Sequence, residues 1–350
     1  MRVRMTAAVA VTAALIGGSV LTGAGPASAQ EQSSPIPVVG DFAGDAREEV
    51  FMYFPGAEID WLVSLARSGD TVTTTRTPFT VNRNYQPVAG NFDGDPHDEI
   101  VWYGYGFDPD YLWNFTSATS ATSTAITVNG LYNPVAGDFD GNGVDDIFWY
   151  GPGPSPDHLW SFAADGSHTS TPKTVSGYYA PVVGSYGTDA TDDIFWYNFD
   201  PPGPDTLWDF RAGTTSYVVR RYTVTRYYQP LSLDVWNDGF GGGDIFWYGF
   251  GPDPDYLWDF ADGRRVSSTR DPVNGFYWPI ATGDFFGDGS DDVLWFSFEL
   301  GFGANVWDHS VSGTTLVRDR FFLPGSAFFG AAAATSATAQ ELGSASVASR

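Results

Sequence analysis

Side chains that carry oxygen recur at alternate positions in two short acidic segments of the chain. In segment 138–146 the alternate positions are held by Asp138, Asp140, Asn142, the backbone carbonyl of Val144, and Asp146. In segment 91–99 they are held by Asn91, Asp93, Asp95, the backbone carbonyl of His97, and Glu99. Ca²⁺ prefers roughly six to eight hard oxygen ligands in a flexible cage. The spacing therefore predicts one calcium ion in each segment.

Four further segments resemble these two but depart from them. Ala43 replaces the ligand at the third position in the first, Ser185 and Gly187 replace two acids in the fourth, the fifth is longer and glycine-rich before Asp244, and the sixth has Phe286 at the third position. We expect weak calcium binding in some of these segments and little or none at the fourth. The alternative is that the acidic segments are solvated turns without metal.

A second set of residues could bind carbohydrate. Tyrosines precede a proline by two positions in five segments, and acids follow proline-rich turns; the candidates are Tyr85, Tyr132, Tyr179, Tyr228, Tyr277, Trp278, Asp108 and Asp110. Aromatic rings stack on the apolar face of a pyranose, carboxylates accept hydrogen bonds from its hydroxyls, and loops on a rigid scaffold often carry binding. Alternatively, the tyrosines cover a packing seam and each aspartate caps its own turn.

The sequence gives little support for catalysis. It has no cysteine, and its four histidines lie in unrelated positions at 97, 158, 168 and 309. Neither a G-x-S-x-G nor an H-E-x-x-H motif is present. A pair of acids could still act on a glycosidic bond, so a polysaccharide lyase or hydrolase remains the alternative to a binding protein.

These candidate residues lie within six copies of one repeat, which begin near residues 37, 87, 134, 181, 230 and 279. In the third copy, four strand-like segments span 134–139, 146–150, 158–162 and about 167–175, separated by Asp, Gly and Pro. Four strands in roughly 45–50 residues match one blade of a β-propeller. The sequence predicts an all-β propeller of six four-stranded blades, with the recurring tryptophans packed between neighbouring sheets.

Two segments carry a resemblance to a known family. GDFDGNGVDDIFWYG (137–151) and GNFDGDPHDEIVWYG (90–104) resemble FG-GAP/VCBS-type repeats, which build the propellers of integrin α-subunits and of many secreted bacterial proteins. The resemblance covers about residues 35–324 and implies calcium in the loop between the first two strands of a blade. Propellers of this family commonly have seven blades, whereas this chain contains six copies.

The two ends of the chain read differently from the repeats. Residues 1–29 have two arginines, an apolar stretch and an Ala-Ser-Ala site, which predicts a secretory signal peptide. We assign residues 30–325 to the propeller, and the Ala/Ser/Thr-rich residues 326–350 to a disordered tail. Loss of Arg2 and Arg4 with the signal peptide would change the net charge from −25 to −27. So acidic a protein repels nucleic acid and anionic membranes.

Together these features predict a secreted, monomeric, calcium-binding propeller. We expect it to bind an extracellular glycan or protein without catalysis, with no nucleic-acid partner and no membrane insertion. The alternatives are a polysaccharide-active enzyme and a purely structural or adhesive module, because one fold hosts many functions.

Overall fold

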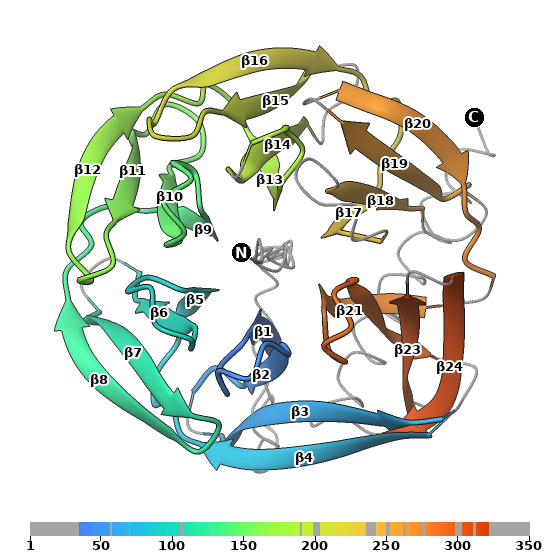
Figure 1. The fold of residues 1–350 in the computed structure, drawn as a ribbon. Coiled ribbons are helices and arrows are strands. Elements are labelled where there is room, and N and C mark those ends of the chain that lie inside the picture. Colours follow the sequence, from blue (N-terminus) through green and yellow to red (C-terminus); the bar gives the residue numbers. More distant parts are fainter. Residues whose placement is uncertain are drawn as a thin grey trace, which may run out of the picture.

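The computed structural model describes residues 35–321, apart from short gaps at 57, 70, 106–107, 190, 199–203, 236–242, 250–252, 262–263, 275–276, 298–302 and 311–312. Every regular element in this part of the chain is a β-strand, and the strands form six four-stranded sheets arranged around a common axis (Figure 1). The prediction of an all-β propeller with six blades is confirmed. The predicted signal peptide, 1–29, and the predicted tail, 326–350, lie outside the described residues.

Each blade consists of four consecutive strands. Blades 1 to 3 are β1 (Ile36–Gly40), β2 (Glu49–Tyr53), β3 (Asp60–Ser68), β4 (Thr71–Phe79); β5 (Gln86–Gly90), β6 (Glu99–Tyr103), β7 (Asp110–Ser117), β8 (Ser120–Ile126); and β9 (Asn133–Gly137), β10 (Asp146–Tyr150), β11 (Asp157–Phe162), β12 (His168–Lys173). Blades 4 to 6 are β13 (Tyr179–Gly184), β14 (Asp193–Asn198), β15 (Asp205–Phe210), β16 (Tyr217–Tyr222); β17 (Gln229–Leu233), β18 (Asp244–Tyr248), β19 (Tyr256–Ala261), β20 (Arg264–Arg270); and β21 (Tyr277–Gly283), β22 (Asp292–Ser297), β23 (Gly303–Ser310), β24 (Gly313–Phe321).

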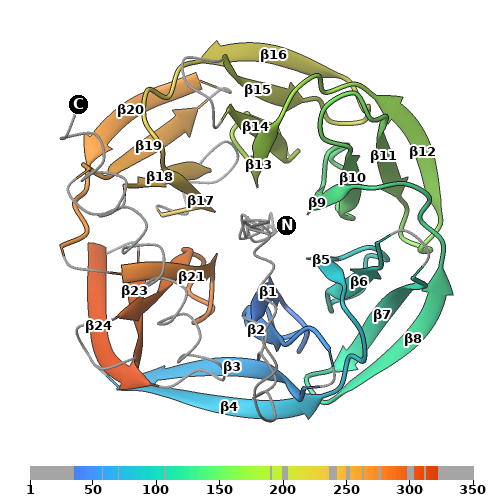
Figure 2. The same cartoon turned by 180° about the vertical axis from the view of Figure 1, so that it is seen from behind.

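Within each blade the strands pair antiparallel in chain order, and the first strand lies nearest the axis (Figure 2). This order divides the loops between the two faces of the disc. The loops between second and third strands and the connections between blades share one side, which we call the loop face. The loops between first and second strands and the hairpins between third and fourth strands share the other, which we call the acidic face because it holds the predicted calcium segments. None of the described residues belongs to a helix long and apolar enough to cross a membrane.

The recurring tryptophans fill the seams between blades, as expected. The tryptophans of the second strands are at most 1% exposed: Trp102, Trp149, Trp196, Trp247 and Trp295. Each packs edge-on against the tyrosine of the preceding blade's second strand; for example, the ring centroids of Tyr103 and Trp149 lie 5.3 Å apart. Edge-to-face pairs of this kind stabilise a core beyond simple burial of area. These indoles are therefore structural and not available to a ligand.

On the acidic face, two reciprocal hydrogen bonds, which we call a latch, join neighbouring blades. The amide of Asp138 donates to the carboxylate of Asp192 at 3.0 Å, and the amide of Asp192 donates to the carbonyl of Asp138 at 2.8 Å. The latch between blades 6 and 1 uses a glutamate in the same way: Asp284 donates to Glu48 Oε2 at 3.0 Å, and Glu48 donates back to the carbonyl of Asp284. In the described part of the chain blades 1 and 6 share no strand, so these hydrogen bonds and the hydrophobic core packed between the two blades close the ring.

On the loop face, a tyrosine hydroxyl makes the matching connection. Tyr103, at the end of β6, donates to the carbonyl of Gly130 at 2.7 Å and accepts from the amide of Tyr132 at 3.3 Å. Blades 1, 3 and 4 repeat both bonds through Tyr53, Tyr150 and Tyr197. These hydroxyls fix the inter-blade connections to the sheets.

Tyr103→Phe should therefore lower the free energy of unfolding by about 1–3 kcal/mol, because it leaves two backbone groups of the seam without their partner. Urea titration measures this change. Tyr178→Phe is the control, since it removes a hydroxyl from a side chain that is 71% exposed. Equal losses in the two variants would show that the Tyr103 hydroxyl does not hold the seam.

Candidate calcium loops and ligand-binding surface

The acidic loop of blade 3 brings three carboxylates together. Oxygen atoms of Asp138, Asp140 and Asp146 all lie within 4.8 Å of one another. Asp138 stands at the end of β9 and accepts hydrogen bonds from the amides of Gly141 and Gly143, at 2.7 and 2.8 Å, so the loop wraps around its carboxylate. Both of these glycines have positive φ values, 73° and 85°, which non-glycine residues adopt at a cost. The glycines thus allow the tight turn that gathers the acids.

The loop of blade 2 forms an equivalent group. Oxygen atoms of Asp93, Asp95 and Glu99 lie within 4.8 Å of one another. Glu99 is fully buried; its Oε2 accepts from the amide of Phe92 at 2.7 Å, whereas its Oε1 has no hydrogen-bond partner in the described structure. A buried carboxylate oxygen without a partner is costly. A bound cation would supply that partner, so the residues of this loop fit a hard divalent ion.

The remaining predicted ligands have partners within the loops. The Asn91 side chain accepts from the amide of Gly94 at 2.7 Å and donates to the carbonyl of Asp95 at 2.6 Å. Asn142 accepts from the amide of Val144 and donates to the carbonyl of Phe162, at 2.7 and 2.8 Å. His97 lies with its Nδ1 3.4 Å from Asp95. The carbonyls of His97 and Val144 stay predicted ligands.

Burial of the Glu99 and Asp146 carboxyl groups favours either a bound cation or a bound proton in these loops. Burial, added to by the neighbouring carboxylates, raises the pKa of Glu99 to about 9, and burial with the nearby Asp140 charge raises the pKa of Asp146 to about 9. Burial also raises the pKa of Asp138 and of Asp140. Without a cation, Glu99 and Asp146 favour their protonated forms, since burial and like charges in a site disfavour the charged form.

In three other blades, the positive charge beside a carboxylate of the acidic face comes from an arginine. In blade 1, Arg47 forms an ion pair with Asp45 of the same loop, which lowers the pKa of Asp45. In blade 6, Asp308 on β23 is 2% exposed and pairs with Arg67, which β3 of blade 1 contributes across the ring closure. Each guanidinium lies where a carboxylate of the acidic face would otherwise be uncompensated.

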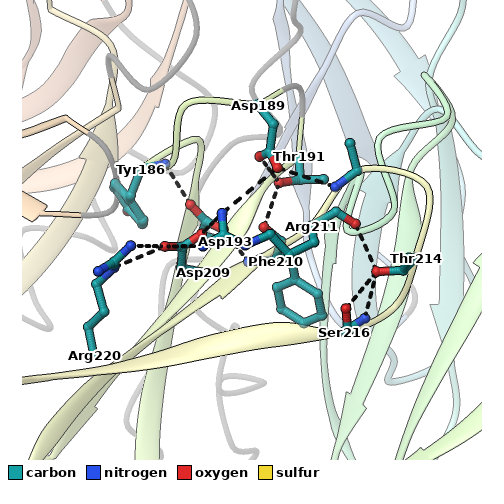
Figure 3. Close-up of polar contacts among 11 residues, drawn as sticks. Tyr186, Asp189, Thr191, Asp193, Asp209, Phe210, Arg211, Thr214, Ser216 and Arg220 are labelled. Carbon is teal, nitrogen blue, oxygen red and sulfur yellow. Dashed lines mark hydrogen bonds and ion pairs between the residues drawn. The ribbon is translucent and has the colours of Figure 1, made fainter.

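Blade 4 has the largest group of such arginine–aspartate contacts (Figure 3). Asp209 at the end of β15 is fully buried; Arg220 contacts its Oδ2 through Nε and Nη2 at 2.9 and 2.7 Å, and Arg211 Nη1 lies 2.7 Å from its Oδ1. The loop has Gly187 where blade 3 has Asp140. A Cβ on Gly187 would lie within 3.5 Å of Asp189, Asp193 and Asp209 oxygens. Asp209 therefore places its carboxylate near the position of the missing third-position acid.

One acid of this region thus comes from the loop in some blades and from the third strand in others. Blades 2 and 3 have an acid at the third loop position and an uncharged residue, Asn114 or Ser161, on the third strand. Blades 4 and 6 have Gly187 or Phe286 in the loop and Asp209 or Asp308 on the strand. Among the described residues, the strand aspartates of blades 4 and 6 are paired with arginine. Much of the blade 5 loop, 236–242, lies outside the described residues.

On the loop face, most of the predicted tyrosines are packing residues. Tyr85 and Tyr132 are 8% and 6% exposed. The half-buried Tyr179, Tyr228 and Tyr277 lie edge-on to the tryptophans of their own blades, with ring centroids 6.0–6.3 Å apart. Half-buried Trp278 packs against the core of blades 6 and 1. Their surfaces face the seams more than solvent.

The two predicted acids differ from each other. Asp110 is 4% exposed, and its two oxygens accept from the amides of Gly104 and Val128, both at 2.8 Å. It caps the turn before β7, as the alternative interpretation stated, and we do not carry it into the binding surface. Asp108 is exposed and pairs with Arg83 at 2.9 Å.

Three exposed residues of the loop face were not among the residues predicted from the sequence. Tyr178, Tyr227 and Leu131 are 71%, 66% and 62% exposed, and each directly precedes one of the predicted tyrosines. Residues in an extended segment alternate between two sides. Since Tyr179 and Tyr228 pack inward, that alternation could have indicated their neighbours. Beside Tyr227, Arg226 pairs with Asp253, which repeats in blade 5 the Arg83–Asp108 pair of blade 2.

Comparison with known proteins supports the fold only. A lectin of Agrocybe aegerita, described as specifically recognising non-reducing terminal N-acetylglucosamine, superposes with a TM-score of 0.55 over 84% of this chain and 83% of its own, at 15% sequence identity. No protein-family model and no curated protein matches the sequence. The chain is thus similar in fold to a lectin propeller, and its relation to FG-GAP/VCBS repeats stays a prediction.

Proposed function

We propose that this protein is a secreted, calcium-binding β-propeller that binds an extracellular glycan through its loop face without chemical turnover. The observation that carries the proposal is the group of exposed aromatic side chains on that face, beside ion pairs that recur in blades 2 and 5. The similarity in fold to a lectin propeller supports it.

The loop-face residues have the chemistry that a neutral sugar needs. Tyr227 offers an exposed ring for the apolar face of a pyranose, and the adjacent Arg226 and Asp253 offer a donor and an acceptor for hydroxyl groups. In blade 2, exposed Tyr105 lies near the Arg83–Asp108 pair in sequence and shares its face. Since both ion pairs are about half exposed, their contribution to stability is small. A role in binding explains better why two blades have them.

Calcium would hold the opposite face. Asp138, Asp140 and Asp146 would hold one ion and Asp93, Asp95 and Glu99 the other, each ion neutralising a cluster that contains one buried carboxylate. The ion would supply charge compensation and rigidity at the inter-blade latches, because Asp138 and Asn91 both belong to a loop and to a latch. The signal peptide predicted at 1–29 and the lack of cysteine agree with export of a chain stabilised by core packing and metal.

Glycan-array screening followed by calorimetry tests the binding surface. Tyr227→Ala should weaken binding of an array-identified glycan about ten-fold through loss of the stacking ring. Val219→Ala is the control, because Val219 is also exposed but lies on the outer strand β16. Affinity unchanged by Tyr227→Ala would remove the loop face from the proposal. Release of new reducing ends or unsaturated sugars would show an enzyme instead.

A further inference from the structure

The seam between blades 5 and 6 contains a cavity of about 340 Å³. Its inner part is apolar, with Val235 and Phe246 of blade 5 facing Val293 and Trp307 of blade 6. It reaches the surface along β20, where Thr269 is exposed. This volume lies at the lower end of the range for small-ligand pockets, roughly 300–1,000 Å³.

Smaller side chains at two repeat positions account for the cavity. The loop position of Val235 holds an aromatic residue in the other blades, and in blades 1 to 4 that ring packs on a phenylalanine of the next blade. The pairs are Phe42–Phe115, Phe92–Phe162, Phe139–Phe210 and Tyr186–Phe260, with centroids 4.8–5.2 Å apart.

The second position follows β20 and holds Asp271. In blade 1 the corresponding residue is Phe79, whose ring lies 6.0 Å from Trp113 of blade 2; in blade 4 it is Tyr222, 6.2 Å from Trp258 of blade 5. At the seam of blades 5 and 6 an acid replaces the aromatic cover of Trp307. The position is not uniform around the ring, since blades 2 and 3 hold Ile126 and Lys173 there, but only blade 5 has an acid. Blade 5 thus differs from the other blades at two sites that face the same space.

One wall of the cavity is polar. Asp259 on β19 and Ser267, Thr269 and Asp271 along β20 all border it, and the Ser267 hydroxyl donates to Asp259 at 3.4 Å. Arg270 also borders the cavity, but strand alternation assigns it to the opposite face of β20 from Ser267, Thr269 and Asp271. The wall therefore presents two carboxylates and two hydroxyls opposite the indole of Trp307, with the Arg270 side chain at its border.

We propose that this seam cavity binds a hexosamine with a free amino group, a pyranose that carries a positive charge. The register places Asp259 opposite Ser267 and Asp271 four residues further along the chain, roughly 13 Å away, so the two carboxylates lie at opposite ends of the polar wall. The sugar's apolar face would stack on Trp307, its ammonium would pair with one carboxylate, and its hydroxyls would bond to the other carboxylate and to Ser267 and Thr269. Two carboxylates that border one cavity, in a protein of net charge −25, attract a cation more strongly than a neutral sugar. The site is separate from the loop face and does not depend on glycan binding there.

Calorimetry of the full chain with D-glucosamine, N-acetyl-D-glucosamine and D-glucose, at a mildly acidic pH that keeps the amine protonated, tests the proposal. D-Glucosamine should bind at least about ten-fold more tightly than the other two, because charged hydrogen bonds contribute more than neutral ones. Asp259→Asn and Asp271→Asn should each weaken it about ten-fold, and Asp165→Asn, on an exposed hairpin, should not.

Asp271→Tyr makes this seam resemble that of blades 4 and 5. It should fill the cavity and abolish D-glucosamine binding without lowering the thermal midpoint, so that loss of binding is not mistaken for unfolding. Equal affinity for N-acetyl-D-glucosamine, or unchanged binding in Asp271→Tyr, would overturn the proposal. Loss of D-glucosamine binding in Tyr227→Ala, with Asp271→Tyr unaffected, would place the sugar on the loop face.

Discussion

Chelation of divalent cations should lower the thermal midpoint of this protein by roughly 10 °C, and added Ca²⁺ should restore it. A ligand that binds only the folded state, at a free concentration of about 100 times its Kd, stabilises that state by about 2.7 kcal/mol per site. Two sites then contribute about 5 kcal/mol, and in a domain of this size each kcal/mol shifts the midpoint by about 2 °C. Differential scanning calorimetry with Ca²⁺ and with chelator measures the shift.

The number of ions bound makes this prediction more specific. We expect two from blades 2 and 3, and Asp140→Asn and Asp93→Asn should each remove one, because each variant deletes a charged oxygen from one cluster. Asp45→Asn in blade 1 is the matched control, since Arg47 already pairs with that acid. An unchanged midpoint under chelation would remove calcium from the proposal. An ion lost in Asp45→Asn would show that arginine does not replace the metal there.

The architecture was predictable because the repeat is regular. The period fixed the number of blades, and alternation of Asp, Gly and aromatic residues placed the strands: segment 146–150 was predicted as a strand and β10 spans Asp146–Tyr150. The acid clusters of blades 2 and 3 were predictable for the same reason, since their carboxylates lie within nine residues of one another in one loop.

The rest of the site depends on contacts between segments distant in sequence. Arg67 reaches Asp308 only because blades 1 and 6 meet at the ring closure. The choice between adjacent tyrosines depends on which side of the seam each residue faces, so Tyr179 was selected where Tyr178 is exposed. The cavity lined by Val235 and Asp271 requires two altered positions that face one space, which a single repeat does not reveal.

Arg220→Met should lower the free energy of unfolding by about 2–4 kcal/mol. Asp209 is fully buried, and Arg220 bonds to it through two nitrogens from β16. Removing one partner of a buried ion pair leaves a charge that neither solvent nor protein compensates, which typically costs about 3–5 kcal/mol. Arg211 retains its contact with Asp209 and lessens the loss. Urea titration of the variant against Arg221→Met, an exposed arginine on the same strand, isolates the effect of the pair.

The double variant Asp209→Asn/Arg220→Met tests whether charge compensation is the cause. If the guanidinium stands where blades 2 and 3 would hold a cation, removing the acid together with the arginine should restore most of the stability that Arg220→Met loses. The stability of Arg220→Met should also rise with added Ca²⁺ more than that of the Arg221→Met control, because three carboxylates around Gly187 then lack one of their two guanidinium groups. A double variant no more stable than Arg220→Met would mean that Arg220 acts through packing of its side chain, and blade 4 would then give no evidence that arginine replaces a metal in this ring.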